Sequence, residues 1–206
     1  MPFVRFENVQ KSYDGDTLVV KDLNLDVDKG EFLTMLGPSG SGKTTCLMML
    51  AGFEPATHGE IYLSGEPINN VPPNKRGIGM VFQNYALFPH MSVAENLAFA
   101  LPASVADRRQ RIAAALAEAD LAGFEDRDPA TLSGGQRARV AALRVLLAEP
   151  AALLLDEPFA KLDAELREQF RRFVFGHARD AGLPVLLVTH DPADAEAAAG
   201  PVLRLG

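Results

Sequence analysis

The stretch LGPSGSGKTT at residues 36–45 decides the fold of this chain. Within it, GPSGSGKT has the spacing G-x-x-x-x-G-K-[S/T] of a phosphate-binding loop. The alternative interpretation is a glycine- and serine-rich turn before a helix, without a binding function. Glycines allow successive backbone N–H groups to point inward at phosphate oxygens. Lys43 can reach the β- and γ-phosphates, and the Thr44 hydroxyl can hold Mg²⁺. The helix that follows would add the positive end of its dipole to the same site. The motif and this helix start together predict a phosphate loop here.

The segments around this loop predict an α/β core. Apolar runs predict buried strands at residues 31–36, 77–83, 151–158 and 184–190, and apolar residues bounded by turns predict strands at 4–9, 23–27 and 59–68. Helical periodicity covers residues 44–50, 164–181 and most of 93–147, with breaks near Pro102 and at 126–135. Because strands at both ends enclose a helical block, we expect an α/β core that carries a helical insertion.

A pair of carboxylates follows the predicted strand in ALLLDEP, residues 152–158. A buried strand that ends in Asp156 can direct a carboxylate toward the shell of a Mg²⁺ ion, and Glu157 can polarise an attacking water. Strands that end in a solvated acidic turn are common, but the phosphate loop in the same chain favours the functional interpretation.

Gln83 and His190 also end predicted buried strands. In parallel α/β sheets, ligands gather at the carboxyl ends of the strands. Gln83 could contact Mg²⁺ or the water, and His190 could form a hydrogen bond with the γ-phosphate, although either alone would be interpreted as a surface or capping residue. That interpretation is kept for His58, His90 and His177, and no cysteine and histidine cluster has metal-ligand spacing.

A second pair of glycines lies in TLSGGQRARVAALRVLLAEP, residues 131–150, at the start of another helical run. Together with the phosphate loop, LLLDEP and VTHD, the LSGGQ at residues 132–136 resembles the motif set of the nucleotide-binding subunits of ABC transporters. The resemblance covers nearly the whole chain. Residues 1 to about 100 look like importer subunits of the polyamine, iron and sugar type, and residues from about 102 look like short cassettes such as thiamine-type importers.

The resemblance implies a role for each matching residue. Tyr13 would stack on adenine, Gln83 would sense Mg²⁺ and the transmembrane partner, and Asp163 would cross between subunits. Asp156 would be the Mg²⁺ acid, Glu157 the general base and His190 the switch histidine. The phosphate-binding residues would be Gly37, Pro38, Ser39, Gly40, Ser41, Gly42, Lys43, Thr44 and Thr45, and the signature motif would be Ser133, Gly134, Gly135 and Gln136.

The family also implies the fold and the assembly. We expect one ABC ATPase domain over residues 1–206, with a P-loop α/β core at 1–83 and 151–206, a small antiparallel β part, and a helical subdomain at 84–150. Two subunits would pack head to tail, with each ATP between the phosphate loop of one and the signature helix of the other. Each glycine motif would then supply one side of a sandwich around the triphosphate, and ATP binding would be converted to movement of a membrane permease.

The attachment surface for that permease should follow Gln83. NYALFPHMSVAENL at residues 84–97 is apolar and aromatic in what should be a loop, although packing under the helical insertion accounts for part of these side chains. In the family this region receives a short helix from the membrane subunit. The candidate contact residues are Tyr85, Leu87, Phe88 and Pro89.

Composition favours a reducing cytoplasm, and the family resemblance implies a protein peripheral on the inner face of the cell membrane. No apolar run reaches the ~18 residues of a membrane span, and the N-terminus lacks the apolar stretch of a secretory signal. The net charge of −7 argues against a nucleic-acid backbone as the main partner. Cys46 is the only cysteine, so no intrachain disulfide can form.

Some features depart from the family pattern and leave alternatives open. Residues 1–100 hold 5 lysines, 2 arginines and 7 asparagines, whereas residues 101–206 hold 1 lysine, 12 arginines and no asparagine, which suggests a chimera fused near residues 101–103. Ala160 stands where the family usually has a serine, and Lys161 stands where a smaller residue is frequent. We also expect this protein to lack the regulatory C-terminal domain of many sugar and polyamine importers. The alternatives are therefore a recombined or engineered chain without a native permease, and a non-transport ABC ATPase.

Overall fold

The computed structural model describes residues 2–102 and 104–205, which separate into two compact units. The first unit holds residues up to 80, then 151–157, and from 178 onward. The second unit holds residues 81–150 and 158–177. These units are defined by contacts, so the functional division at residues 83 and 151 that the family implies remains a prediction.

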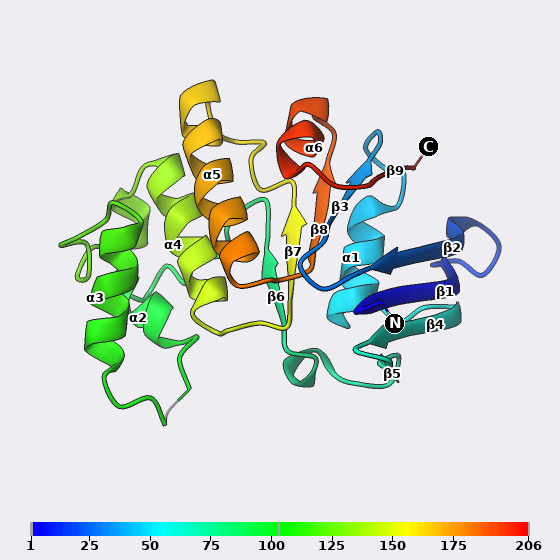
Figure 1. Ribbon diagram of the computed structural model, residues 1–206, viewed down its shortest axis with the longest axis horizontal. Helices are drawn as coiled ribbons and strands as arrows, with labels where there is room; N and C mark the ends of the chain where they lie inside the picture. Colours follow the sequence, from blue (N-terminus) through cyan, green and yellow to red (C-terminus); the bar gives the residue numbers. More distant parts are fainter. Residues whose placement is uncertain (1, 103, 206) are drawn as a thin grey trace. The chain divides into compact units, whose positions relative to one another are not determined.

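The first unit contains an antiparallel sheet in the strand order β2-β1-β4-β5 (Figure 1). Its strands are β1 (Val4–Ser12), β2 (Leu18–Val27), β4 (His58–Leu63) and β5 (Glu66–Pro67). The single strand predicted at residues 59–68 is therefore wrong. Ser64 and Gly65, with φ of 54° and 85°, turn the chain back so that β5 pairs with β4. The predicted antiparallel part is confirmed.

A second sheet in the first unit has the order β6-β7-β8-β3-β9, from β3 (Phe32–Leu36), β6 (Ile78–Val81), β7 (Ala152–Asp156), β8 (Val185–Thr189) and β9 (Val202–Arg204). Strand β8 pairs in parallel with both β7 and β3, and every residue of these three strands is buried. This explains their continuous apolar runs, because a central parallel strand is covered on both faces. The short β9 was not predicted, since three partly exposed residues carry little periodicity.

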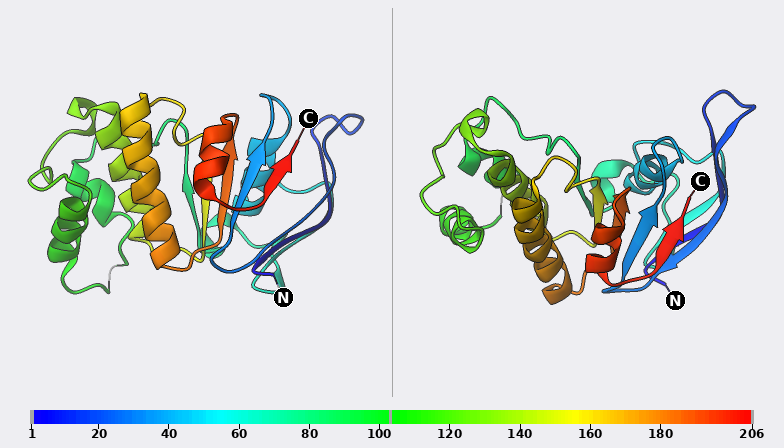
Figure 2. Two further views of the ribbon diagram at one scale, coloured as in Figure 1. Left: turned by 45° about the horizontal axis from the view of Figure 1, so that its top comes forward. Right: turned by 90° about the horizontal axis from the view of Figure 1, so that it is seen from above.

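Helix α1 (Lys43–Ala51) packs between the two sheets of this unit. Its apolar side chains share one core with residues of β1, β2 and β4 and with alternate residues of β3, β7 and β8. Helix α6 (Pro192–Ala198), which was not predicted, contacts β3 and β8 from the opposite face (Figure 2). Arg76 closes the end of α1, because its Nη1 donates hydrogen bonds to the carbonyls of Met49 and Leu50.

The second unit is helical, as expected from the periodicity between the early and late strands. It contains α2 (Val93–Ala98), α3 (Arg108–Glu118), α4 (Gly134–Leu146) and most of α5 (Ala164–Asp180). Two one-turn helices, η1 (Pro73–Lys75) in the first unit and η2 (Pro129–Thr131) in the second, complete the helices of the described residues. Buried residues of α2, α3 and α4 form the core of the second unit.

Candidate functional site

The loop between β3 and α1 curls around the ammonium group of Lys43. Lys43 Nζ donates hydrogen bonds to the carbonyls of Gly37 and Pro38 at 2.8 and 2.7 Å, and the residue is only 5% exposed. Pro38, Ser39 and Gly40 at the outer turn of the loop are exposed. The loop therefore holds one cation beneath an accessible backbone.

Two glycines of this loop are required by the packing of the chain itself. A Cβ at Gly37 would lie 2.0 Å from the carbonyl oxygen of Leu205, just after β9. Gly42 has a φ of 88°, and its Cβ would lie 2.8 Å from the Val19 carbonyl on β2. Gly40, with a φ of 84°, has nothing within 4 Å of a Cβ. Only Gly40 is thus explained by its backbone conformation and open position alone.

Thr44 and Asp156 are brought together by the parallel sheet. Thr44 Oγ1 donates a hydrogen bond of 2.9 Å to Asp156 Oδ1, across 112 positions of the sequence. Asp156 is 8% exposed, and this burial raises the pKa of its carboxyl group, with the Thr44 hydrogen bond acting in the opposite direction. The carboxylate is therefore short of stabilising partners when it is ionised.

Glu157 and His190 form a pair that their positions in the sequence did not reveal. His190 Nδ1 lies 2.7 Å from Glu157 Oε2, with the glutamate side chain 19% exposed and the histidine 62% exposed. The register of β7 and β8 places Asp156 opposite Val188, so the residues after both strands end at the same edge. Glu157 has a φ of 47°, which is rare for a side-chain-bearing residue, and its N–H donates to the Val188 carbonyl.

Tyr13 follows β1, and its ring is 60% exposed beneath the ammonium group of Lys11, 4.6 Å from the ring centroid. A separate cavity of ≈ 360 Å³ lies beside the phosphate loop and includes Val19, Lys21, Ser41 and Arg204 in its lining. Of these, only Ser41 was predicted. The others were missed because their contribution depends on β2 and β9 lying next to the loop, which no local motif signals.

The signature residues begin α4 in the second unit. Ser133 is the N-cap, its Oγ accepts a hydrogen bond from the Gln136 N–H, and Gln136 Oε1 accepts one from the Ser133 N–H. This reciprocal capping box explains the serine and the glutamine within one chain. A Cβ at Gly135 would lie 3.0 Å from Leu166, whereas one at Gly134 would be at an ordinary 3.8 Å from Leu162.

Other predicted site residues of the second unit are exposed. Gln83 lies in the turn after β6, and Asp163 precedes α5, where its Oδ1 accepts a hydrogen bond from the Leu166 N–H. Ala160 is half-buried and Lys161 is exposed. The structure thus gathers the phosphate loop with Asp156, Glu157 and His190 in the first unit, and Gln83, the signature residues and Asp163 in the second.

The predicted attachment surface needs one correction, because Tyr85 is only 5% exposed. Its side chain turns inward, and its hydroxyl donates a 3.3 Å hydrogen bond to the Pro158 carbonyl. Phe88 is half-buried, Pro89 is exposed, and Phe99, which was not predicted, is 67% exposed. The rings of Phe88 and Phe99 meet edge to face at 4.9 Å, so they form one aromatic patch.

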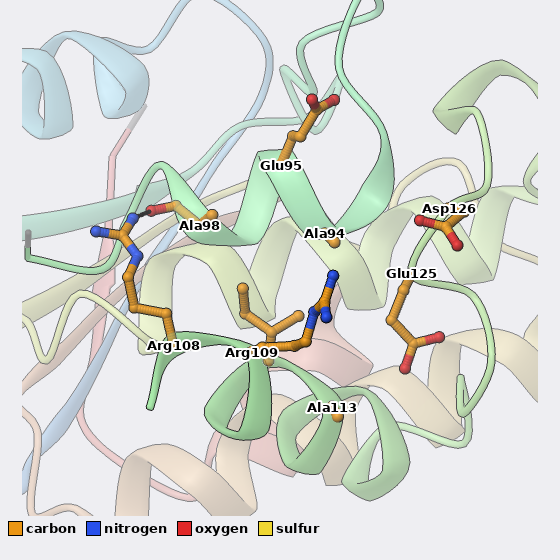
Figure 3. A pocket seen from close by; sticks show the side chains of 9 residues that line it. Ala94, Glu95, Ala98, Arg108, Arg109, Ala113, Glu125 and Asp126 are labelled. Atoms are coloured by element: carbon orange, nitrogen blue, oxygen red, sulfur yellow. Dashed lines mark hydrogen bonds between the residues drawn. The ribbon is translucent and has the colours of Figure 1, made fainter. Parts of the chain in front are cut away.

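A cavity of ≈ 580 Å³ lies between α2, α3 and residues 125 and 126 of the second unit. Its apolar lining comes from Ala94, Ala98, Ile112 and Ala113. Arg109 extends from α3 toward Ala94, and the side chains of Glu125 and Asp126 line the cavity beside it (Figure 3). Arg108 donates a hydrogen bond to the Ala98 carbonyl. The cavity combines a small-residue floor with charges of both signs.

Within residues 2–102 and 104–205, no three His, Cys, Asp or Glu side chains are grouped as a metal site. No helix in the same part of the chain has the length and apolar character needed to cross a membrane.

Comparisons with known proteins agree with the motifs. The family described as "ABC transporter" matches residues 20–160. The maltose/maltodextrin import ATP-binding protein MalK of Escherichia coli K12 is 45% identical over 208 residues, covering all of this chain and 56% of MalK. The spermidine/putrescine import ATP-binding protein PotA of Clostridium novyi is 47% identical over 195 residues, covering 93% of this chain and 56% of PotA. The chain thus spans about half the length of the curated relatives it matches.

Solved structures match the fold over nearly its whole length. The dimeric structure of MJ0796, a bacterial ABC transporter cassette, superposes with a TM-score of 0.86 and 32% identity, covering 98% of this chain and 94% of the cassette. A dimeric post-hydrolysis state of MJ0796 bound to ADP and Pi gives a TM-score of 0.85 and 33% identity with the same coverage.

Proposed function

This chain belongs to the ABC transporter family, and from that premise we propose that it binds and hydrolyses ATP to drive a membrane permease. The observation that carries the proposal is the meeting of four groups in the first unit: the phosphate loop, the Thr44–Asp156 hydrogen bond, Glu157 and His190. The similarity to MalK and PotA supports an importer of the sugar or polyamine type. On this proposal the protein is cytoplasmic and peripheral to the membrane.

The chain's own residues divide the work. Lys43 and the backbone of residues 38–41, of which 38–40 are exposed, bind the triphosphate, since an ammonium and inward N–H groups complement its charge. Tyr13 offers an exposed ring for the adenine base. Glu157 holds the attacking water and accepts its proton, and His190, hydrogen-bonded to Glu157, orients that carboxylate beside the γ-phosphate.

The Thr44 and Asp156 pair fits a magnesium ion. Mg²⁺ binds through few protein oxygens and keeps waters and substrate phosphates as its other ligands, so a cluster of three acidic or histidine side chains is not required. A buried carboxylate whose pKa is raised by desolvation gains most from a nearby cation. Bound there, Mg²⁺ would neutralise charge on the phosphates. We propose Gln83 as a further Mg²⁺ contact on the family resemblance alone.

ATP would be held between two copies of the chain. Ser133, Gly134, Gly135 and Gln136 begin a capped helix whose first N–H groups suit an anion. Gly134 supports this assignment, because among residues 2–102 and 104–205 a Cβ at Gly134 would meet only Leu162, at an ordinary 3.8 Å. Asp163 is exposed before α5 and is proposed to cross to the partner. The dimeric structures of MJ0796, one of them bound to ADP and Pi, support a pair of copies.

The permease would contact the aromatic patch of Phe88 and Phe99 with the adjoining Leu87 and Pro89, together with the cavity of ≈ 580 Å³. The patch exposes aromatic carbon, and the cavity adds a floor of alanines between charges of both signs. A short amphipathic helix with apolar residues on one side fits this chemistry. Tyr85 is excluded from the contact by its burial.

The proposal is tested with Glu157→Gln. We expect ATP hydrolysis to be lost while ATP binding persists, because the amide cannot accept the proton of the attacking water. Size-exclusion chromatography with ATP and Mg²⁺ should then show a dimer that the unmodified protein forms only transiently. Glu165→Gln, an exposed change in the first turn of α5, is the control and should hydrolyse normally. Normal turnover by Glu157→Gln would contradict the assignment.

A further inference from the structure

Tyr85 and Ala86 adopt a backbone conformation that residues with a side chain rarely take. Their φ angles are 62° and 45°, and neither is glycine. Such positions persist only where the surroundings hold them, and an observed outlier of this kind is a starting point for a functional hypothesis. The pair sits two residues after Gln83, immediately before the proposed permease contact.

The group that holds this pair comes from the signature helix. Arg144, in the last turn of α4, donates from Nη2 to the carbonyl of Ala86 at 2.8 Å and to that of Tyr85 at 3.4 Å. Its guanidinium also lies over the Phe88 ring, 4.9 Å from the centroid. The Arg144 side chain therefore contacts both residues of positive φ and the Phe88 ring of the aromatic patch.

Two other contacts complete the attachment. Asn96, which is fully buried in α2, accepts from the Phe88 N–H at 2.8 Å and donates to the Phe88 carbonyl at 3.1 Å. The Tyr85 hydroxyl donates to the carbonyl of Pro158, which follows Glu157 in the chain, and burial raises the pKa of this phenol so that it keeps its proton. Residues 85–88 are therefore hydrogen-bonded to Arg144 of α4, to Asn96 of α2, and to Pro158, which follows the proposed base Glu157.

Burial by itself disfavours an arginine at this position, so its hydrogen bonds to residues 85 and 86 must offset that cost. Among the described residues Arg144 has no carboxylate partner, and burial lowers the pKa of its guanidinium from the ordinary value. An apolar side chain would avoid that desolvation. The negative end of the α4 dipole would favour any cation, lysine included, whereas only the planar guanidinium can stack on a ring while donating to two carbonyls.

We propose that Arg144 is a positioning residue that couples the start of the signature helix to residues 85–88. Helix α4 begins after the Ser133 cap and carries Arg144 in its last turn, so a movement of its first turn against a partner's nucleotide would be carried to the Tyr85 and Ala86 carbonyls. Release of those two residues to negative φ angles would give the segment a second state, which nucleotide could then favour or disfavour. The inference rests on the proposed function, because it uses ATP-driven dimer closure.

The test is hydrogen exchange measured by mass spectrometry on Glu157→Gln protein with and without ATP and Mg²⁺. The Tyr85, Phe88 and Met91 amides are all hydrogen-bonded, so peptides over residues 84–92 report the state of the segment. We expect ATP to change exchange in these peptides, and Arg144→Gln and Arg144→Lys each to abolish that change while dimer formation persists. Arg139→Gln is the matched control, since Arg139 lies on the same helix but donates to Ala119 and Gln169.

The outcomes separate the inference from the function on which it rests. Absence of an ATP-dependent dimer in Glu157→Gln would count against the proposed function itself. A dimer with unchanged exchange at residues 84–92, or a change that survives both Arg144 variants, would overturn the coupling. Normal behaviour of Arg144→Lys alone would show that charge suffices and would overturn the positioning role. Failure of both Arg144 variants to unfold cooperatively on heating would assign Arg144 to stability instead.

Discussion

At the scale of single residues, the proposed site contains one carboxylate whose burial disfavours its charge and another whose backbone has an unfavourable conformation. Asp156 is buried, and Glu157 has a left-handed backbone. Neither condition favours folding, and both place a carboxylate where the phosphate loop ends. Functional sites commonly hold such unfavourable features, which the rest of the fold must offset.

Asp156→Asn should make the protein without nucleotide more stable at neutral pH. Burial raises the folded-state pKa of Asp156, so the native state binds this proton more tightly than the unfolded chain. The favourable contribution of the protonated group is complete below the ordinary value of 3.8 and is lost as the pH rises through the raised folded value. Asparagine escapes this loss and still accepts the hydrogen bond from Thr44 through its amide oxygen.

Thermal unfolding across pH checks this expectation. The melting temperature of Asp156→Asn should exceed that of the unmodified protein at pH 7, with the gap closing toward pH 3.8, and Mg²⁺-dependent hydrolysis should be lost. Asp163→Asn is the control, because that carboxylate is exposed. A lower melting temperature for Asp156→Asn at pH 7 would show that the carboxylate stabilises the empty fold.

At the scale of elements, the start of α4 serves two purposes that its four signature residues divide among them. Ser133 and Gln136 cap the helix, and Gly135 makes room for Leu166 of α5. These three are accounted for within one chain. Gly134 is the residue left without an internal reason, since its Cβ would meet Leu162 only at 3.8 Å.

The two glycines should therefore respond differently to alanine. Gly135→Ala presses on Leu166 at 3.0 Å and should be less stable than Gly134→Ala by about 1 kcal/mol, as for a small overpacking change. Gly134→Ala should keep its melting temperature but fail to form the ATP dimer in the Glu157→Gln background. Chemical denaturation and size-exclusion chromatography give the two readouts. An ATP dimer of Gly134→Ala as tight as that of its parent would refute the proposed contact.

At the scale of the whole molecule, the two glycine motifs raise the question of whether they serve one ATP within a chain or one ATP across a dimer. A head-to-tail twofold pair brings the phosphate loop of each copy to the signature helix of the other. Mutants in the two motifs then complement each other when mixed. Within a single chain they do not.

The mixing experiment uses Lys43→Ala in one chain and Ser133→Arg in the other, with Glu157→Gln in both. One interface of the mixed dimer pairs both defects, and the other pairs an intact phosphate loop with an intact signature. Dimers isolated with two different affinity tags should trap about one ATP each. Binding confined to monomers and unaffected by Ser133→Arg would exclude the arrangement across the dimer.

The composition change near residue 101 also belongs to this scale, and a fused origin is not shown. MalK matches both halves in a single alignment over the whole chain. In the first unit, early β3 and late β8 pair in register over five residues that are all buried, although the buried Thr34 hydroxyl on β3 has no partner among the described residues. In the second unit the cavity of ≈ 580 Å³ is lined from both sides of residue 101. The late Arg144 nevertheless contacts the early Ala86 directly.

The amino-acid sequence by itself determined the local parts of this protein. The phosphate loop, the apolar strands with polar ends and the start of a helix at the second pair of glycines were all predicted, and so were the α/β class and the family. Spacing suffices for such features, because the conformation of a loop or a helix start depends on a few consecutive residues. The turn at Ser64 was missed, since apolar residues continue on both sides of it.

Only the tertiary structure decided which distant groups meet and which side chains reach the surface. The Thr44–Asp156 and Glu157–His190 contacts depend on the order and register of parallel strands far apart in the sequence. Tyr85 is buried and Phe99 exposed, although both aromatic rings lie in apolar stretches. Burial is set by the neighbour that packs against a side chain, and that neighbour is chosen by the fold of the whole chain rather than by adjacent residues.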